Sequence, residues 1–344
     1  MAVSADLRTP LDAAEIGAAA VRIAPFVRRT PLVPSDGLSA AAGVPVDLKL
    51  DQLQDGGAFK LRGASNLLAT LPGAALAKGV VAVSTGNHGR AVALAARRRG
   101  VRAVVCMSGL VPSNKVEAIR ALGGEVRIVG RSQDDADEEA RRLMREEGLA
   151  YASPFDDPAI IAGQGTIGLE LLEDAPDLSA VLVPVSGGGL VAGVALALKS
   201  VRPEVRIIGV SMERGAAMHT SLSVGRPVVV EELPTLADSL GGGVGLENRH
   251  TLALARDLID DFILLTEAEI AEGMRWLYRN EQLVTEGAAA VGVGALLSGK
   301  AGALPGRTAV LVTGRNVDMD VFTQIVSAPS AAEAVARVGL LEAA

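Results

Sequence analysis

Residues 56–66 read GGAFKLRGASN and place a lysine, Lys60, between Phe59 and Leu61. The chain has 33 lysines and arginines together, and only six of them are lysines. Because this sequence generally uses arginine for positive charge, a lysine in an apolar stretch needs another explanation. An amine can form an imine with an aldehyde, whereas a guanidinium cannot. Lys60 is therefore a candidate for covalent chemistry.

The composition excludes several classes of protein. Of the 344 residues, 49% are hydrophobic but only 2% are aromatic, so we expect a large core of Ala, Val, Leu and Ile. The net charge of −7 argues against a nucleic-acid-binding surface. No apolar run reaches the length of a membrane span and no signal peptide is recognisable, so we expect a cytoplasmic protein without membrane contact. The single cysteine, Cys106, excludes an intrachain disulfide, and we expect a buried, inert thiol.

Short apolar runs alternate with helical patterns along the chain, which is typical of βαβ units and a parallel sheet. Residues 79–85 and 101–107 have the pattern of strands, and residues 90–100 have that of a helix that follows a GNHG turn. The predicted fold class is α/β, with two open, twisted parallel-sheet domains. We expect a small domain at residues 80–153, inserted into a large domain formed by residues 1–79 and 154–344.

A glycine run follows one of the predicted strands, in AVLVPVSGGGLVAG (residues 180–193). Glycines between a strand and a helix let backbone N–H groups converge on an anion at the helix N-terminus. A phosphate can be held there without a basic side chain. The spacing matches neither the ATP-binding P-loop nor the dinucleotide-binding loop. The alternative is a tight packing turn that binds nothing.

The stretch STGNHG (residues 84–89) also lies between a predicted strand and a predicted helix, where free N–H groups can bind a carboxylate. Asn87 and His88 add polar side chains, although a helix cap is an alternative role for His88. The other two histidines, His219 and His250, are isolated, and no spacing indicates a zinc site. A lysine, a phosphate cradle and a carboxylate-binding turn together favour a phosphorylated aldehyde bound to Lys60, which is pyridoxal 5′-phosphate (PLP).

Five stretches, in this order, resemble the fold-type II PLP enzymes, in particular the serine/threonine dehydratase and serine racemase group. They are GAFKLRGASN, STGNHG, PFDDPAIIAGQGTIGLE, PVSGGGLVAG and VTGRN. The resemblance covers about residues 20–325 and implies a tryptophan synthase β-like fold. It implies that Lys60 is the Schiff-base lysine, that Phe59 packs against the cofactor and that Asn87 binds the ring hydroxyl of PLP.

The same resemblance assigns the remaining site residues. It implies a phosphate site made of Ser186, Gly187, Gly188, Gly189 and Leu190. It implies a substrate-carboxylate loop made of Ser84, Thr85, Gly86 and His88, and it places the Thr313 hydroxyl against the pyridine nitrogen.

Three residues depart from the family pattern. Ser186 replaces the glycine that usually opens the phosphate loop, and its hydroxyl either adds a phosphate contact or changes nothing. Thr85 replaces the serine acid/base of the racemases, and its hydroxyl can still transfer a proton although its rotamers are more restricted. Arg315 follows Gly314 where the family has a second glycine, and it faces either an acidic group on the substrate or the solvent.

A hydroxyl beside the ring nitrogen leaves the pyridine neutral, which favours elimination of a β-substituent over reactions with a long-lived carbanion. Lys60 is expected to remove the α-proton of a 3-hydroxy-α-amino acid, and the β-hydroxyl then leaves, giving a keto acid and ammonia. Residues 209–218, 236–248 and 312–318 resemble the hydroxyectoine-utilisation dehydratases, which implies a hydroxylated diaminobutyrate-type substrate. The alternatives are an L-threonine/L-serine dehydratase, a serine or hydroxyaspartate racemase/dehydratase, and a non-catalytic PLP or amino-acid-binding protein.

We expect no metal site. Many relatives hold a divalent cation with acidic residues at two positions that are Ser211 and Ala217 in this chain, and Glu213 between them is a single carboxylate. Hard cations require several oxygen ligands. The expected partners are a small amino-acid substrate and further copies of the chain, in a homodimer or another homo-oligomer.

Overall fold

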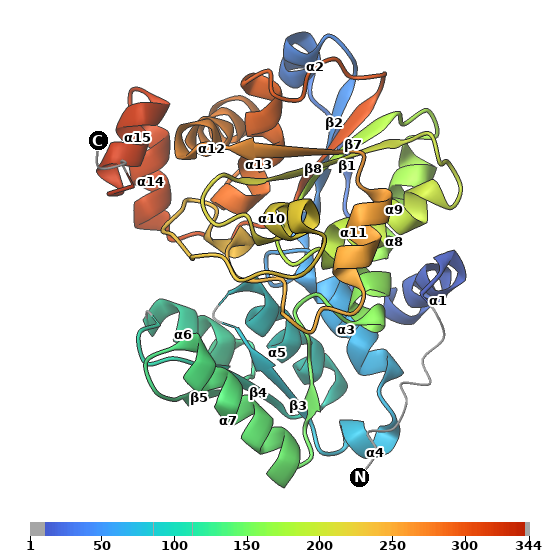
Figure 1. Cartoon of the computed structure of the whole chain (residues 1–344), viewed down its shortest axis with the longest axis vertical. Helices are drawn as coiled ribbons and strands as arrows, with labels where there is room; N and C mark the ends of the chain where they lie inside the picture. The colour runs from blue at the N-terminus through green and yellow to red at the C-terminus, as the bar shows by residue number, and fades with distance from the viewer. Residues whose placement is uncertain (1–10, 85, 112, 341–344) are drawn as a thin grey trace.

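The computed structural model describes residues 11–84, 86–111 and 113–340, which form two β-sheets with helices packed on them (Figure 1). The larger sheet has the strand order β1-β2-β10-β7-β8-β9. Its strands are β1 (Leu32–Pro34), β2 (Val46–Leu50), β7 (Ala180–Pro184), β8 (Arg206–Met212), β9 (Asp261–Leu265) and β10 (Thr308–Val312). The smaller sheet has the order β5-β4-β3-β6, with strands β3 (Val80–Val83), β4 (Ala103–Met107), β5 (Glu125–Ile128) and β6 (Ala150–Tyr151).

The predicted α/β class with parallel sheets is confirmed, with one exception. All pairs in the smaller sheet are parallel, and so are the pairs of the larger sheet from β2 to β9. Strand β1 instead runs antiparallel to β2, in the register Leu32↔Lys49. This strand lies at the sheet edge and ends at Pro34, which cannot donate a ladder hydrogen bond and is tolerated at an edge.

Fifteen α-helices and two short 3₁₀ helices connect and cover the strands of the described residues. They are α1 (Ala13–Ile23), α2 (Asp36–Ala42), η1 (Asp51–Leu53), α3 (Lys60–Thr70), α4 (Gly73–Leu76), α5 (Asn87–Arg99), α6 (Ser113–Ala121), α7 (Gln133–Glu146), α8 (Pro158–Asp174), α9 (Gly189–Lys199), α10 (Ala217–Val224), η2 (Asp238–Leu240), α11 (Thr251–Leu258), α12 (Glu267–Glu281), α13 (Gly287–Leu297), α14 (Met319–Ser327) and α15 (Ala331–Arg337). Within residues 11–84, 86–111 and 113–340, no helix has the length and apolar character needed to span a bilayer.

Helix α5 shows how local sequence signals set the element boundaries. It ends with three arginines, as predicted, and Gly100 closes it in the left-handed conformation at φ 65°. The predicted GNHG turn is wrong in part, because the helix already begins at Asn87 and the turn is confined to the residues before it. Two of the turn's polar side chains therefore lie in the first turn of a helix.

The core consists of small aliphatic side chains, as the composition predicts. Every residue of β2, β4, β7 and β10 is buried, which is the pattern of strands covered on both faces. Cys106 on β4 is fully buried, and burial raises the pKa of its thiol to about 11. The predicted inert role of this cysteine agrees with both observations.

The strands of the smaller sheet fall within residues 80–151 and those of the larger sheet fall outside this range. The exact domain boundaries, at residues 79/80 and 153/154, stay a prediction. Helix α3, which precedes the first boundary, packs against both α5 and α8. It therefore joins the two halves of the molecule and carries Lys60 at its first residue.

A buried ionic cluster lies behind the start of α3. The Arg62 guanidinium donates to both carboxylate oxygens of Asp51 at 2.9 and 2.8 Å. It also donates to both oxygens of Glu170 on α8, at 2.6 and 3.0 Å. Lys49 of β2 lies 2.6 Å from Glu170 and is itself fully buried. The cluster thus connects β2, η1, α3 and α8 through charges that are buried except for Glu170, which is 12% exposed.

Replacing Arg62 by methionine should destabilise the protein strongly, because it leaves the fully buried Asp51 without its cationic partner and removes one of the two cations that pair with Glu170. Breaking a buried ion pair by removing one member costs about 3–5 kcal/mol. The matched control is Arg142→Met on α7, whose ion pairs with Glu139 and Glu146 are partly exposed and contribute at most about 1 kcal/mol. Urea unfolding of both variants measures the difference, and equal losses of unfolding free energy would contradict the role of the cluster.

Candidate active site

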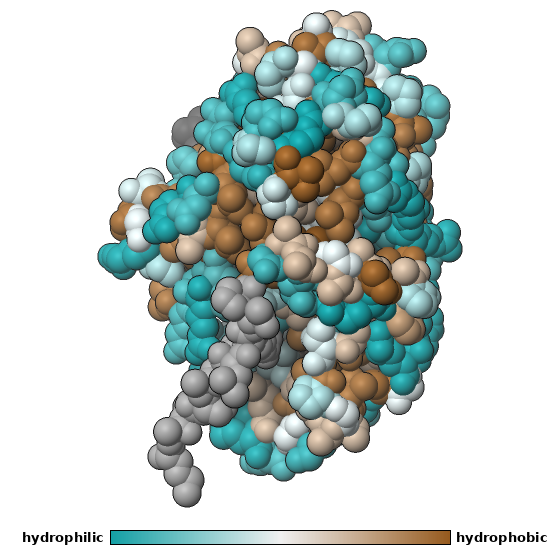
Figure 2. All heavy atoms as spheres, turned by 90° about the vertical axis from the view of Figure 1, so that its right-hand side faces the viewer, coloured by the Kyte–Doolittle hydropathy of each residue, from teal (hydrophilic) through white to brown (hydrophobic). Residues whose placement is uncertain are grey.

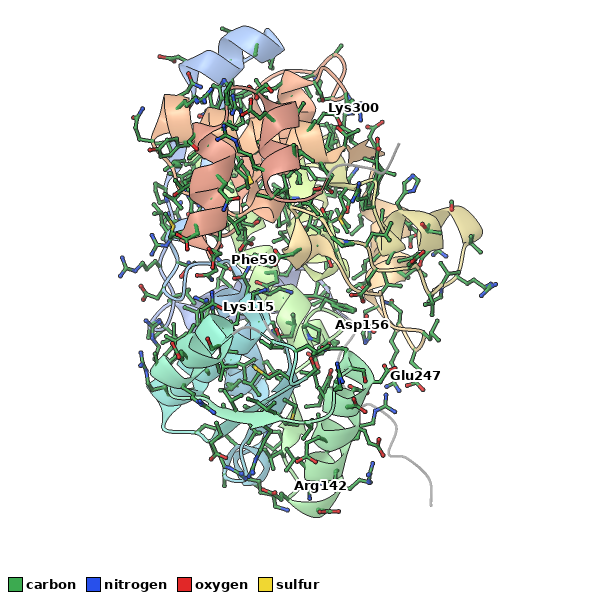
Figure 3. All side chains as sticks on the ribbon, turned by 90° about the vertical axis from the view of Figure 1, so that its left-hand side faces the viewer. Phe59, Lys115, Arg142, Asp156, Glu247 and Lys300 are labelled. Atoms are coloured by element: carbon green, nitrogen blue, oxygen red, sulfur yellow. The ribbon has the colours of Figure 1, made fainter. Side chains whose placement is uncertain are left out.

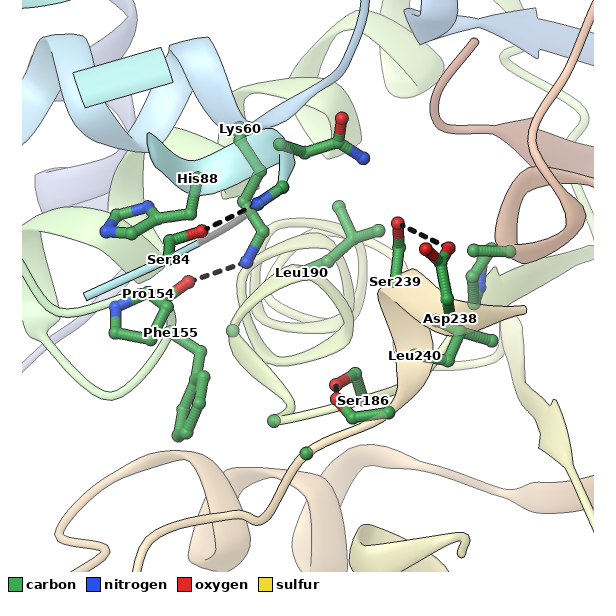
Figure 4. Close-up of a pocket in the computed structure, with 18 of the residues that line it drawn as sticks. Lys60, Ser84, His88, Pro154, Phe155, Ser186, Leu190, Asp238, Ser239 and Leu240 are labelled. Atoms are coloured by element: carbon green, nitrogen blue, oxygen red, sulfur yellow. Dashed lines mark hydrogen bonds between the residues drawn. The ribbon is translucent and has the colours of Figure 1, made fainter. Parts of the chain in front are cut away.

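A cavity of about 430 Å³ opens between the two sheets, at the carboxyl ends of their strands (Figure 4). Val83 at the end of β3 and Ser84 after it line the cavity, as do Ser186 after β7 and Thr313 after β10. In α/β proteins ligands bind at this end of the strands, where loops supply the polar groups. Except for Thr85, which lies outside the described residues, every residue predicted for the site lines this cavity.

Lys60 extends into the cavity from the first residue of α3. Its Nζ atom donates to the Pro154 carbonyl oxygen at 2.6 Å and lies 5.3 Å from the centre of the Phe59 ring (Figure 4). Burial lowers the pKa of the Lys60 amine to about 8, and the nearby Glu286 carboxylate opposes the shift. A substantial neutral fraction near physiological pH makes this amine a nucleophile and a base.

The predicted phosphate loop is a glycine turn between β7 and α9. Gly188 has φ +91°, a conformation that favours glycine. A Cβ atom on Gly187 would collide with the Phe155 ring, and one on Gly189 would lie 2.8 Å from the Phe155 carbonyl oxygen. No side chain caps the N-terminus of α9, so its first N–H groups face the cavity as an anion site. Ser186 donates its hydroxyl to the Gly241 carbonyl at 3.3 Å.

Asp156 holds the segment of residues 249–251, which packs against this loop. Its carboxylate accepts hydrogen bonds from three consecutive backbone N–H groups, those of Arg249, His250 and Thr251, at 2.7, 2.9 and 2.9 Å. Thr251 in turn contacts the position where Gly188 would carry a Cβ. Asp156 and Phe59 lie near the level at which the two halves of the molecule meet (Figure 3). Asp156 therefore fixes the segment that packs on the phosphate loop.

The predicted carboxylate loop leads into α5. The Gly86 N–H group donates to the Ser84 hydroxyl at 3.3 Å, and His88 Nε2 lies 2.8 Å from the Ala152 carbonyl oxygen. Burial lowers the pKa of His88 to about 3, with the Lys60 charge as a further cause. The imidazole is therefore neutral, and this side chain offers no positive charge to a carboxylate. The groups that this loop offers to an anion are N–H groups, hydroxyls and the N-terminus of α5.

The two residues of the VTGRN stretch that the sequence singled out have different surroundings. Thr313 is buried and lines the cavity, and its carbonyl oxygen accepts a hydrogen bond from the Phe59 N–H group at 3.0 Å. Arg315 is exposed and does not contribute to the cavity wall. Of the two roles considered for Arg315, the solvent-facing one fits this position.

Sequence reasoning missed Glu286, a buried carboxylate in the cavity wall. Both of its oxygens accept from the Asn87 side-chain amide, at 2.7 and 3.0 Å. Burial raises the pKa of Glu286 to about 7, although the hydrogen bond from Asn87 opposes the shift. One signal was present in the sequence. Glu286 directly precedes the apolar helix sequence GAAAVGVGALL, where a charged residue has no obvious partner.

The family model for pyridoxal-phosphate dependent enzymes matches residues 23–314. The chain belongs to this family. A "Putative threonine dehydratase" from Sinorhizobium fredii is 53% identical over 89% of this chain and 92% of its own length. An L-threonine ammonia-lyase from Geobacter sulfurreducens is 42% identical over 89% of this chain and 75% of its own length.

Solved structures of PLP-dependent enzymes have the same fold. Maize serine racemase has a TM-score of 0.86 at 34% identity, covering 92% of this chain and 97% of its own. The processed form of threonine deaminase isoform 2 from Solanum lycopersicum has a TM-score of 0.84 at 33% identity, covering 94% of this chain and 91% of its own. Together these relatives confirm the predicted fold-type II serine/threonine dehydratase family and identify the chain as a PLP-dependent lyase.

The observed site fits PLP. Lys60 supplies an amine for the aldehyde, and the glycine loop before α9 supplies backbone N–H groups for the phosphate. Phe59, Asn87 and Thr313 line the space between these two features. When bound, the cofactor supplies an electron sink that stabilises negative charge at the α-carbon of an amino acid.

The region predicted to lack a metal site has the following contacts. The Ser211 hydroxyl faces the Met212 sulfur at 3.4 Å. Glu213 lies 3.4 Å from the Lys300 ammonium, which also pairs with Glu269 at 2.7 Å. Among the described residues, no three His, Cys, Asp or Glu side chains are grouped so that they could hold a metal ion. The absence of a metal requirement stays a prediction.

Replacing Lys60 by alanine should abolish both the visible absorbance of bound PLP and turnover, because the amine that binds the aldehyde is lost. Lys60→Arg should fail in the same way, since a guanidinium forms no imine. Circular dichroism should show an unchanged fold for both variants. Normal turnover in either variant would refute the assignment of Lys60.

Exhaustive treatment with EDTA should leave the melting temperature and the turnover number unchanged. The physical reason is that Ser211 and Ala217 provide no carboxylate, while the Glu213 carboxylate already faces the Lys300 ammonium. Thermal unfolding and an ammonia-release assay measure the two quantities before and after dialysis. A loss of activity that Mg²⁺ or Ca²⁺ restores would show that a cation site exists.

Proposed function

We propose that this PLP-dependent lyase removes the β-hydroxyl of a 3-hydroxy-α-amino acid longer than threonine, namely a hydroxylated diaminobutyrate-type product of hydroxyectoine breakdown. The observation that carries the proposal is the cavity wall opposite Lys60. It is formed by Asp238, Ser239 and the glycines 241–243, all within the stretch 236–248 that resembles the hydroxyectoine-utilisation dehydratases.

The residues of this chain account for the steps of such an elimination. Lys60 Nζ, as the neutral amine, takes the α-proton, and its lowered pKa places it in the range of an effective base. The N–H groups and hydroxyls before α5 hold the substrate carboxylate, and Asn87 orients the ring. The β-hydroxyl leaves with a proton as water, and addition of water to the remaining enamine releases a keto acid and ammonia. Thr85, together with Lys60, is the second proposed catalytic residue, and its hydroxyl group would transfer a proton.

The glycine run supports a longer substrate because it leaves space. A Cβ atom on Gly242 would meet no atom within 4 Å, and one on Gly243 would meet only the Gly245 nitrogen, at 3.8 Å. The carboxylates of Glu232 and Asp238 also line the cavity and provide acceptors for an amino group on the substrate. Threonine, which ends in a methyl group, would make no polar contact with these carboxylates.

A plain L-threonine or L-serine dehydratase is the second candidate, because the relatives from Sinorhizobium fredii and Geobacter sulfurreducens are named for threonine. A serine or hydroxyaspartate racemase/dehydratase is a third, supported by the similarity to maize serine racemase. All three candidates use the same amine, phosphate loop and carboxylate loop. They differ in what must fill the cavity beyond the β-carbon.

A panel of 3-hydroxy amino acids tests the proposal. We expect kcat/KM for 3-hydroxy-2,4-diaminobutyrate or its N-acyl derivative to exceed that for L-threonine and L-serine at least tenfold, which corresponds to about 1.4 kcal/mol. Ammonia and keto-acid release measure turnover, chiral chromatography detects racemisation, and Lys60→Ala is the inactive control. Equal or better turnover of L-threonine would favour the second candidate, and a racemised product would favour the third.

We also propose that the protein is a cytoplasmic homodimer or other homo-oligomer. Apolar side chains gather in patches on the face of the molecule that bears α1, α8 and α9 (Figure 2). Val21 on α1 and Val201 after α9 are 78% and 64% exposed. Exposed apolar surface of this kind is typical of association sites. Light scattering after size exclusion measures the subunit number.

A further inference from the structure

The Glu286 side chain is unusual because it does not cap the helix at whose N-terminus it lies. Glu286 is the N-cap residue of α13, yet its carboxylate makes no hydrogen bond to the N–H groups of that helix. The side chain instead extends into the cavity wall, where it is 4% exposed and accepts two hydrogen bonds from Asn87. Burying a carboxylate costs free energy because the charged group loses its hydration. We therefore expect a role of Glu286 other than helix capping.

The Asn87 amide is held on both sides. Its Nδ2 atom donates to Glu286, and its Oδ1 atom accepts from Asn316 Nδ2 at 2.7 Å. Asn316 is fixed in turn, because its Nδ2 also donates to the Gly56 carbonyl at 2.8 Å and its Oδ1 accepts from Arg90 at 3.1 Å. This chain of contacts joins residues from four segments, and it determines how the Asn87 amide is oriented.

The amide nitrogen of asparagine carries two hydrogens. Nδ2 lies 2.7 and 3.0 Å from the two Glu286 oxygens, and a single hydrogen shared between these oxygens makes both contacts. The second hydrogen is then left for a group in the cavity that Asn87 lines. Glu286 accepts from the amide nitrogen and Asn316 donates to the amide oxygen, so the two contacts together present a donor, and not an acceptor, to the cofactor.

Three charged groups influence Glu286 from the elements around it: Lys60 on α3, Arg90 on α5 and Asp238 on η2. Burial and Asp238 favour the protonated carboxyl group, whereas the Asn87 hydrogen bond and Arg90 favour the ionised form. Burial is the largest of these effects, and it raises the pKa of Glu286 to about 7. The group therefore changes its protonation within the range in which enzymes of this kind are assayed.

We propose that Glu286 is a positioning residue of this active site, whose carboxylate orients the Asn87 amide so that one N–H group points at the ring hydroxyl of PLP. The inference rests on the cofactor that the family shows, and it does not depend on which 3-hydroxy amino acid is the substrate. It can therefore be tested on the resting holoenzyme, and a failure of the substrate proposal leaves it intact.

The main test is Glu286→Gln, which keeps the size and an acceptor oxygen but removes the negative charge. The absorption spectrum of bound PLP is recorded without substrate from pH 6 to 9. Toward pH 6 the wild-type carboxyl group is mostly neutral, like the glutamine, so the two spectra should converge. Above about pH 7 the wild-type group is ionised, and the spectra should diverge. The matched control is Glu247→Gln, an exposed residue that lies outside the cavity wall and should follow the wild type throughout.

A second set of variants shows whether Glu286 acts through Asn87. Asn87→Ala alone should change the spectrum, and adding Glu286→Gln to it should cause no further change, because the residue through which the carboxylate acts is already gone. Glu286→Ala should release PLP at least tenfold more readily on dialysis than Glu286→Gln. Unfolding midpoints of the apoproteins show whether each variant is folded.

Two results would overturn the proposal. The first is a Glu286→Gln holoenzyme whose spectrum follows the wild type at every pH. The second is a spectral effect of Glu286→Gln that is equally large with and without the Asn87 side chain. Either result would mean that Glu286 stabilises the fold around the cavity without orienting the amide.

Discussion

The arrangement of the site depends on the ion pairs that the Arg62 guanidinium makes with Asp51 and Glu170. The guanidinium donates to Asp51 on η1 and to Glu170 on α8, so η1, α3 and α8 are fixed relative to one another by one side chain. Arg62 follows Lys60 by two residues in the first turn of α3. The reactive amine therefore stands on a helix end that is anchored by buried charge, and its position does not rely on a flexible loop. A lysine at position 62 would provide neither the planar geometry nor the number of donors.

Elsewhere in the cavity wall, backbone N–H groups are most of the groups available to bind an anion. The glycine turn before α9 presents N–H groups because Phe155 fills the volume that side chains would take, and Asp156 secures the neighbouring segment. The carboxylate loop uses the start of α5 with a neutral His88. The cavity thus contains few fixed positive charges. In the proposed site, oriented dipoles would recognise the phosphate and the carboxylate, and such dipoles keep their strength over a wide pH range.

The sequence predicted the parts of the site that are local. Lys60, the glycine run and the turn before α5 each carry their signal within a few residues, since each depends on the chemistry of one strand–helix junction. Glu286 and Asp156 were not predicted, because their roles consist of contacts with residues 199 and 93 or more positions away. The antiparallel edge strand β1 was missed for a similar reason. Its three residues are too few to show a periodicity, and only its pairing with β2 defines it.

The division of the cavity between two sheets has a consequence for how such an enzyme can diversify. The phosphate turn and Thr313 belong to the larger sheet, whereas the loop before α5 belongs to the smaller one. Helix α6, which carries Lys115 (Figure 3), is linked to the part of the chain around the larger sheet by the Lys115–Asp238 and Asn114–Asp318 pairs at 3.3 and 3.2 Å. The proposed substrate wall at Asp238, Ser239 and the glycines 241–243 is separate in sequence from Lys60 and from the phosphate turn, so mutations can accumulate there while the cofactor-binding residues are inherited unchanged. A lineage can in this way acquire a new amino-acid preference without passing through ancestors that have lost their cofactor.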